Sequence, residues 1–271
     1  MGWGDEILVT GEARALYEQT RRHVVVTDRH NKPRWHELWT NVGWISKERR
    51  ADTIDMQNGP GCRPYIDYER MAREFHAIYP NRTFSTKRRD ARLPYRFNDH
   101  KAKRGHLPLI EDRTCLGYSV IEPHYSLKNC NREWGFDNWQ AVVEARRERQ
   151  WVQINPKGAR ILRGVHHYPA NSFVAALRIL AHADLYVGPE GGLYHAAVAL
   201  GIPSVAIFGG FVSPANQGYD LPNVVNLWAD IEGTPCGQRV PCDHCKAAMS
   251  MISPGDVRDG IVHVLKGASA P

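Results

Sequence analysis

The residue types best suited to chemistry lie together in residues 183–210, ADLYVGPEGGLYHAAVALGIPSVAIFGG. Glu190, the pair Gly191 and Gly192, and His195 stand between two short apolar runs. The apolar runs predict buried parallel strands, and the glycines predict a turn that opens a short helix. Ligands of such units bind outside the carboxyl ends of the strands, where a helix N-terminus offers N–H groups to a phosphate. The spacing therefore favours an anion-binding site over glycines that serve turn geometry alone.

A second glycine-rich segment opens the chain. The residues Gly-Trp-Gly-Asp-Glu at positions 2–6 predict a turn, and residues 7–22 predict a helix with a basic C-terminal end. An Asp that follows Gly commonly serves as a helix N-cap, and this is the simplest role for Asp5.

The elements that must position these residues alternate along the chain. Residues 23–28 predict a buried strand, whereas residues 46–66 and 81–113 are polar, are marked by Pro and Gly, and predict loops. From Ser119 to Phe208, strand and helix patterns alternate, which is typical of a doubly wound parallel sheet. Residues 253–265 predict a capped closing helix.

Charge divides the 271-residue chain, whose net charge is +6. Residues 1–130 hold 23 Lys and Arg against 17 Asp and Glu, while residues 131–271 hold 12 of each, so the N-terminal half carries the whole excess. The excess peaks over residues 82–104, where aromatic residues are interleaved with basic ones. This run indicates either a solvated loop or a site for an anionic partner, namely a phosphorylated glycan, a membrane surface or a nucleic acid. The candidate contacts are Arg88, Arg89, Arg92 and Arg96.

Composition is that of a soluble globular protein, with 42% hydrophobic and 24% charged residues. No apolar run is long enough for a membrane helix, and the N-terminus lacks a signal-peptide pattern, so we expect a cytoplasmic protein that could attach peripherally to a membrane. The charge break predicts two domains, over residues 1–122 and 123–271.

Three of the six cysteines form one short cluster with a histidine. The segment PCGQRVPCDHC places three thiols and an imidazole within ten residues, a donor set that suits zinc or iron, although unligated thiols are the simpler interpretation. These positions are Cys236, Cys242, His244 and Cys245.

Four segments together resemble glycosyltransferase family 9, the heptosyltransferase-like enzymes. Residues 184–210 resemble the family's motif Asp/Glu-Thr-Gly-x-x-His-x-Ala-Ala-Ala-x-Gly-x-Pro, and residues 2–16 its Gly-Asp turn and following helix. Residues 122–143 are similar to its segment in which a basic residue precedes a Trp, and residues 249–265 to its closing helix. The resemblance implies the α/β fold called GT-B, in which two Rossmann-like domains with parallel sheets face each other across a cleft. The N-terminal domain would be trimmed here, since the family has a strand before the Gly-Asp turn.

The resemblance also implies roles for particular residues. Asp5 matches the family's catalytic base, which takes a proton from the acceptor hydroxyl as it attacks the anomeric carbon with inversion, and its neighbour Glu6 could substitute. Six residues would bind the donor, a nucleotide-diphosphate sugar, and they are Lys128, Arg132, Glu190, Gly191, Gly192 and His195. No metal or other cofactor is required, because fixed cations and a helix N-terminus can neutralise the leaving diphosphate.

The acceptor is the least constrained part of the predicted function. By family analogy it is a hydroxyl of an anionic bacterial surface saccharide, such as lipopolysaccharide core, on the basic N-terminal domain. The basic segment also suits a phage-type DNA glycosyltransferase acting on hydroxymethylated pyrimidines, which would flip the base or accept it unpaired. A third alternative is a nucleotide-binding module that has lost the chemistry.

Overall fold

The computed structural model describes residues 2–66, 68–69, 72–73, 80–81, 116–123, 132–155, 158–210, 212–234, 236 and 242–268. Its N-terminal elements are α1 (Trp3–Thr20), β1 (His23–Thr27), the 3-10 helix η1 (Glu37–Trp39) and β2 (Thr53–Gln57). The strands of the C-terminal part are β3 (Tyr118–Ile121), β4 (Gln150–Gln153), β5 (His166–His167), β6 (Leu185–Pro189), β7 (Ser204–Ile207) and β8 (Val224–Leu227). Its helices are α3 (Phe136–Ala145), α4 (Phe173–Leu180), α5 (Gly192–Ala199), α6 (Pro214–Gln217), α7 (Asp243–Ser250) and α8 (Pro254–Ala268).

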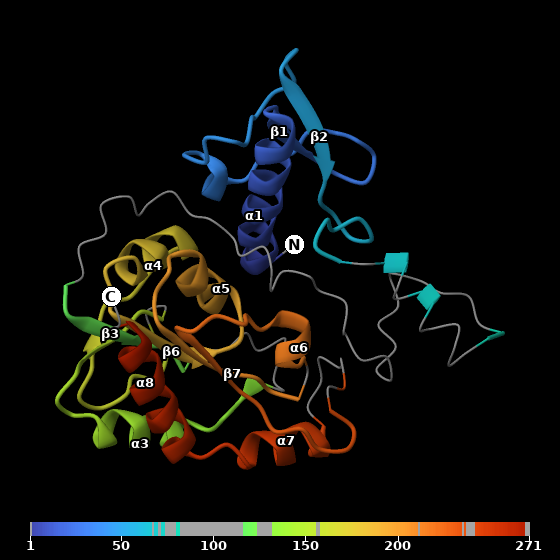
Figure 1. Cartoon of the computed structure of the whole chain (residues 1–271). Helices are drawn as coiled ribbons and strands as arrows, with labels where there is room; N and C mark the ends of the chain where they lie inside the picture. The colour runs from blue at the N-terminus through green and yellow to red at the C-terminus, as the bar shows by residue number, and fades with distance from the viewer. Residues whose placement is uncertain are drawn as a thin grey trace.

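The six C-terminal strands form one parallel sheet in the order β5-β4-β3-β6-β7-β8 (Figure 1). The chain builds outward from β3 to β5, then returns to β6 beside β3 and builds outward to β8. This is the strand order of doubly wound nucleotide-binding sheets, in which ligands bind at the carboxyl ends of the two central strands. The order therefore places the expected site beyond the ends of β3 and β6.

Helices cover both faces of this sheet, as the alternation of its side chains requires. Val120 and Tyr186 point into the core under α4 and α5, whereas Ile121 and Val187 point into the core against α3 and α8. Strands buried on both faces read as continuous apolar runs, which is why the sequence predicts β6 and β7 well. The short strands β5 and β8 escaped prediction because their polar residues interrupt that pattern.

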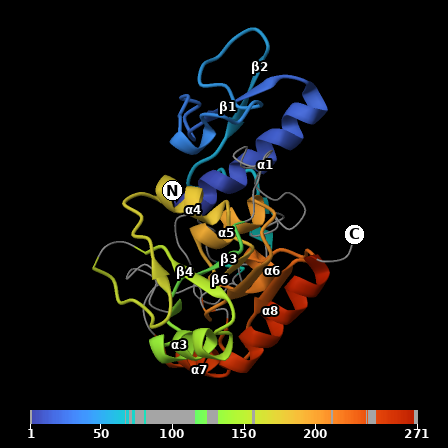
Figure 2. The same cartoon turned by 90° about the vertical axis from the view of Figure 1, so that its left-hand side faces the viewer.

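Helix α1 joins the N-terminal strands to the C-terminal part (Figures 1 and 2). The indole of Trp39 donates a hydrogen bond to the carbonyl of Glu6, and that of Trp44 to the carbonyl of Thr10, so two tryptophans hold the helix on one side. The helix begins at Trp3, so the predicted glycine turn over residues 2–6 is wrong. Gly2 is the N-cap, and its backbone N–H donates to the Asp5 carboxylate at 2.9 Å, which satisfies a donor at the helix end.

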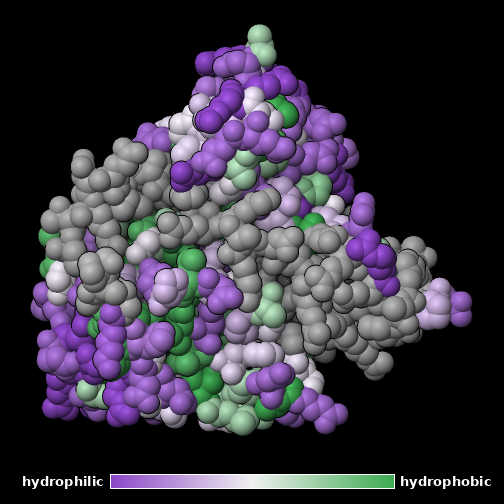
Figure 3. All heavy atoms as spheres, in the orientation of Figure 1, coloured by the Kyte–Doolittle hydropathy of each residue, from purple (hydrophilic) through white to green (hydrophobic). Residues whose placement is uncertain are grey.

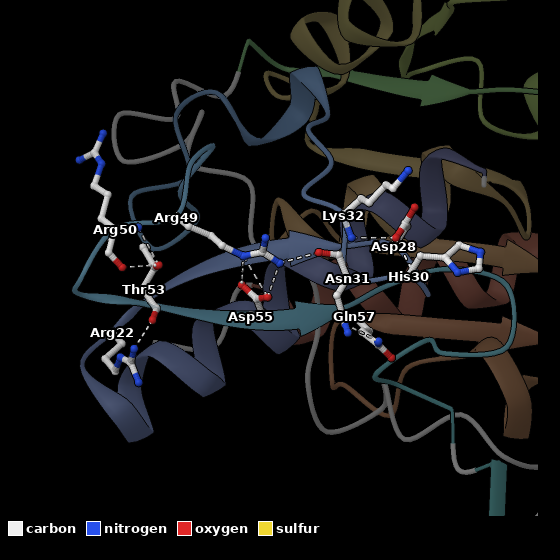
Figure 4. A network of polar contacts seen from close by, with 10 residues as sticks. All are labelled: Arg22, Asp28, His30, Asn31, Lys32, Arg49, Arg50, Thr53, Asp55 and Gln57. Carbon is white, nitrogen blue, oxygen red and sulfur yellow. Dashed lines mark hydrogen bonds and ion pairs between the residues drawn. The ribbon is translucent and has the colours of Figure 1, made fainter.

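The predicted loop over residues 46–66 is also wrong in part, since it contains β2, which pairs with β1 in parallel. Polar side chains on the exposed face of β2 hid its periodicity. Arg49 pairs with Asp55 at 2.6 Å and donates to the carbonyl of Asn31, while Gln57 donates to the Asn31 side chain (Figure 4). This network ties the loop after β1 to β2.

The other predicted helices are confirmed, including α4 with its Ser172 cap and the closing helix α8. Strand β3 lies before the predicted domain boundary at residue 122, yet it pairs with β4 and β6 of the C-terminal sheet. The division into two domains stays a prediction, and a boundary that keeps this sheet whole would lie before Tyr118. Among the described helices, none is long and apolar enough to cross a bilayer. Hydrophilic side chains cover most of the visible N-terminal surface at the top of Figure 3.

Candidate functional site

Two buried carboxylates mark the carboxyl ends of the two central strands. Glu190 follows β6 and is 2% exposed, and Glu122 follows β3 and is 3% exposed. The backbone N–H of Glu122 donates to the carbonyl of Val187, which continues the pairing of β3 with β6 to this edge. Burial raises the pKa of the Tyr186 phenol, and the charges of Glu122 and Glu190 raise it further. Both carboxylates therefore act electrostatically on the same phenol, that of Tyr186, at the switch point of the sheet.

Arg132 neutralises Glu190. Its Nη2 lies 2.5 Å from Glu190 Oε2, and both side chains are largely buried. The guanidinium also lies over Gly191, because a Cβ at that glycine would be 3.7 Å from Arg132 Nη1. Helix α5 begins at Gly192, so a permanent cation and a helix N-terminus occupy the same place. The arrangement suits an anionic ligand such as a diphosphate.

His195, on the first turn of α5, contacts Glu190 on one side and Tyr219 on the other. Its Nε2 lies 3.5 Å from Glu190 Oε1, and its Nδ1 lies 2.8 Å from the Tyr219 hydroxyl. Burial raises the pKa of Tyr219, with Tyr194 and Glu190 adding to the rise, so the phenol keeps its proton. The structure thus brings together five of the six predicted donor-site residues, namely Arg132, Glu190, Gly191, Gly192 and His195.

The N-terminal ends of α1 and α5 meet directly. A Cβ on Gly4 would lie 2.7 Å from His195 Cδ2, and a Cβ on Gly192 would lie 3.3 Å from Trp3 Cβ. The Trp3 ring stacks on Phe173 with ring centroids 4.6 Å apart. Glycine at position 4 is therefore what allows this approach. Asp5 is the next residue of α1, one position beyond this contact.

The Asp5 carboxylate accepts a hydrogen bond from the segment that follows β2 and forms an ion pair with it. The Tyr65 hydroxyl donates to Asp5 Oδ1 at 2.5 Å, and Arg63 Nε lies 3.0 Å from the same oxygen. Oδ2 accepts from the backbone N–H of Gly2. A carboxylate has about four lone-pair positions, so these contacts leave room for an acceptor hydroxyl.

Glu6 points elsewhere. Its carboxylate pairs with Arg34 at 2.5 Å, and burial raises its pKa although Arg34 opposes the rise. The guanidinium of Arg34 also lies over the Trp39 ring. The Glu6 side chain therefore lies in the N-terminal core, where it pairs with Arg34 and not with Tyr65 or Arg63, the partners of Asp5.

The sequence patterns did not predict four residues of the site, which are Arg63, Tyr65, Glu122 and Tyr219. Only Glu122 left a local signal, as an acid directly after an apolar strand, whereas the others reach the site from distant loops. Lys128 and the basic run over residues 82–104, with Arg88, Arg89, Arg92 and Arg96, lie outside the described residues.

The cysteine cluster forms a compact donor set beside the sheet. The ligand atoms of Cys236, Cys242, His244 and Cys245 lie within 4.8 Å of one another. The Cys236 and Cys242 sulfurs are 3.8 Å apart, close to the spacing of about 3.8 Å for two ligands of a tetrahedral metal with bonds of about 2.3 Å. The backbone N–H of Cys236 donates to the carbonyl of Gly210, beyond β7. The donor types and the compactness of the set therefore suit zinc or iron, whereas the Cys236 and Cys245 sulfurs, 3.1 Å apart, are closer together than that spacing.

Comparison with known proteins decides which family this site belongs to. Residues 116–243 match the family described as glycosyltransferase family 9 (heptosyltransferase). This segment is a glycosyltransferase family 9 domain. It contains both central strands of the sheet, all of the donor-side residues named above and the first residue of α7. No match was found among curated proteins.

Solved glycosyltransferase structures support an α/β fold of the GT-B type for this chain. The family 9 glycosyltransferase of Veillonella parvula DSM 2008 superposes with a TM-score of 0.58 at 13% identity, over 98% of this chain and 95% of that one. The iron-containing dodecameric glycosyltransferase TibC from enterotoxigenic E. coli H10407 superposes with a TM-score of 0.50 at 18% identity. That match covers 61% of this chain and 49% of TibC, so this chain spans about half the length of that relative.

Proposed function

We propose that this protein transfers a sugar from a nucleotide-diphosphate sugar to a hydroxyl of an anionic acceptor, with inversion and without a catalytic metal. The contact between the N-termini of α1 and α5 carries the proposal. Through Gly4 and His195 it joins a carboxylate that can act as a base to a buried cation and a helix N-terminus that suit a diphosphate. TibC, a structural relative, has been solved in complex with ADP-D-beta-D-heptose, which supports the donor class.

On the donor side, Arg132 and the N–H groups at the start of α5 would bind the diphosphate. Both are in place before the reaction, so they stabilise the negative charge that develops on the leaving group without reorganisation. Glu190, oriented by Arg132 and His195, would accept hydrogen bonds from hydroxyls of the sugar. The N–H groups and the dipole at the start of α5, with hydrogen-bond donors of the Arg132 guanidinium that also pairs with Glu190, would stabilise the leaving group and carry the metal-independent part of the proposal.

On the acceptor side, Asp5 would take the proton as the acceptor hydroxyl attacks the anomeric carbon. The C–O bond to the acceptor forms while the bond to the diphosphate breaks, so the configuration inverts. Tyr65 and Arg63 hold Oδ1 in place, and Oδ2 is the oxygen that receives the proton.

Asp5→Asn tests this mechanism. The amide keeps the size of the side chain but cannot accept the proton, so transfer should fall about a hundredfold or more while donor affinity stays unchanged. A thermal-shift screen of nucleotides and nucleotide sugars first identifies the donor, because a ligand of the folded state raises Tm. Glu18→Gln, on the exposed face of the same helix, is the matched control. Unchanged transfer by Asp5→Asn would contradict the assigned base.

The anionic acceptor is proposed on the charge of the N-terminal half, and two acceptor classes need separate tests. Phosphorylated oligosaccharides should accept the sugar from the identified donor. Duplex DNA with hydroxymethylated pyrimidines should give a mobility shift that weakens steeply with salt if DNA is the acceptor. No shift at low salt would remove the DNA alternative.

We also propose that Cys236, Cys242, His244 and Cys245 hold a structural zinc or iron. Bound there, the metal would supply no chemistry to the transfer but would fasten the loop before α7 to the end of β7. Support comes from the compact donor set and from TibC, which is iron-containing.

Metal removal tests this site. Elemental analysis should find about one zinc or iron per chain, and a chelator should lower Tm because binding energy contributes to folding. Cys242→Ser should lose the metal, whereas Cys62→Ser, outside the cluster, should keep it. A protein that contains no metal and whose Tm is unchanged by the chelator would contradict the metal site and indicate that the thiols are unligated.

A further inference from the structure

We propose that Tyr219 is a positioning residue that holds His195 in the tautomer with its proton on Nε2, and thereby orients Glu190 toward the donor sugar. The inference rests on the proposed function, because Glu190 is assigned there to the sugar. Nothing in the family motif points to Tyr219, which lies between α6 and β8 and reaches His195 only through the fold.

The contacts form one chain across the switch point. Tyr219 Oη lies 2.8 Å from His195 Nδ1, His195 Nε2 lies 3.5 Å from Glu190 Oε1, and Arg132 closes the chain at Glu190 Oε2. All but Arg132 are less than 5% exposed, so water has little access to this chain. Catalytic hydrogen bonds are often long before substrate binds, and 3.5 Å is in that range.

The chemistry of these groups sets the direction of each hydrogen bond. Burial raises the pKa of Tyr219, so its hydroxyl keeps a proton that it can donate to Nδ1. A neutral imidazole has one ring proton; where Nε2 faces a carboxylate, that proton resides on Nε2, and Nδ1 is left to accept from Tyr219. The Glu190 carboxylate can only accept, so it receives this proton's hydrogen bond. Arg132 already balances the charge of Glu190, so the chain does not require a charged imidazole.

The backbone of Tyr219 is itself held at two points. Its backbone N–H donates to the Tyr194 hydroxyl at 3.2 Å, and its carbonyl accepts from Asn226 Nδ2 at 2.9 Å. The Tyr194 hydroxyl donates to Asn226 Oδ1, which ties both contacts to β8. The preceding residue must be glycine, because a Cβ on Gly218 would lie 2.6 Å from the carbonyl oxygen of Pro214. The phenol is therefore fixed before any ligand binds.

Ring-nitrogen NMR of His195, assigned by its loss in His195→Gln, tests the proposal directly. The wild-type protein should show the Nε2–H tautomer. Tyr219→Phe removes the donor to Nδ1, so the Nδ1–H form should gain population and the KM for the donor should rise about fivefold, the loss of one ordinary hydrogen bond. Tyr118→Phe, which removes a phenol bonded to the Ile179 carbonyl at the opposite end of β3, should change neither.

An Nδ1–H tautomer in the wild-type protein would overturn the proposal, and this measurement does not depend on how well the variant folds. An unchanged tautomer or an unchanged donor KM in a folded Tyr219→Phe variant would also overturn it. If no nucleotide sugar binds or reacts with the wild-type protein, the proposed function fails, whereas the tautomer still tests the hydrogen-bond chain by itself.

Discussion

At the residue scale, a few charged groups are buried in pairs rather than exposed. Glu190 with Arg132 and Glu6 with Arg34 each combine a carboxylate with a guanidinium at 2.5 Å. Burying either charge alone would cost several kcal/mol, so each pair is stable only as a pair. The first pair lies at the switch point of the sheet and the second in the N-terminal core. Similar chemistry thus serves the site in one case and the fold in the other.

Removal of one partner should expose this dependence. Arg132→Met leaves Glu190 buried without its cation and should lower the free energy of unfolding by about 3–5 kcal/mol. Adding Glu190→Gln removes the stranded charge and should restore part of the loss. Denaturant unfolding measures both, with Arg163→Met, in an exposed pair with Glu144, as the control. Equal stability of the single and the double variant would contradict a coupled pair.

At the element scale, two helices approach each other end to end. The N-termini of α1 and α5 meet with so little space that position 4 has no room for a methyl group beside His195. The two helix dipoles alone would disfavour this approach, because both N-terminal ends carry partial positive charge. The charges of Asp5 and Glu190 near the two ends offset that repulsion, and an anionic ligand would offset it further.

Gly4→Ala should report on this contact. In an ordinary helix position the change stabilises by about 1 kcal/mol, because Ala has the higher helix propensity. Here the new Cβ meets the His195 ring at 2.7 Å, so we expect a loss of about 1–3 kcal/mol from overpacking. In a His195→Ala background the ring is gone and the same change should become neutral or stabilising. A gain from Gly4→Ala in the wild-type background would show that the two helix ends are farther apart.

At the scale of the whole molecule, the proposed function requires two parts of the chain to meet. All of the described donor-side residues lie within residues 116–243, whereas Asp5 and its partners come from the first 65 residues. Trp3 contributes to both parts, since its ring stacks on Phe173 of α4 and meets His36 edge-on. The stack thus holds α1, which carries the proposed base, against α4 beside the proposed donor site.

Trp3→Ala should separate transfer from donor binding. Loss of the stack loosens α1 from α4 and α5, and a misplacement of about 1 Å can cost about a hundredfold in rate. Donor affinity, measured by calorimetry, should stay within about twofold of the wild-type value, because the substitution removes no hydrogen bond between the protein and the donor. Trp35→Ala, which loses an edge contact with Trp39 inside the N-terminal part, is the control. Wild-type transfer by Trp3→Ala would show that the link is dispensable.

Local pattern in the sequence determined the strands β6 and β7, the helix α5 between them and the grouping of Glu190, Gly191, Gly192 and His195 at its start. These features depend on apolar periodicity and glycine spacing within about thirty residues, which a single segment carries. Only the tertiary structure decided that α1 starts at Trp3, that Glu6 pairs with Arg34, and that Arg63, Tyr65 and Tyr219 reach the site. Those contacts join residues distant in sequence, and their energies depend on burial and packing, which no local pattern records.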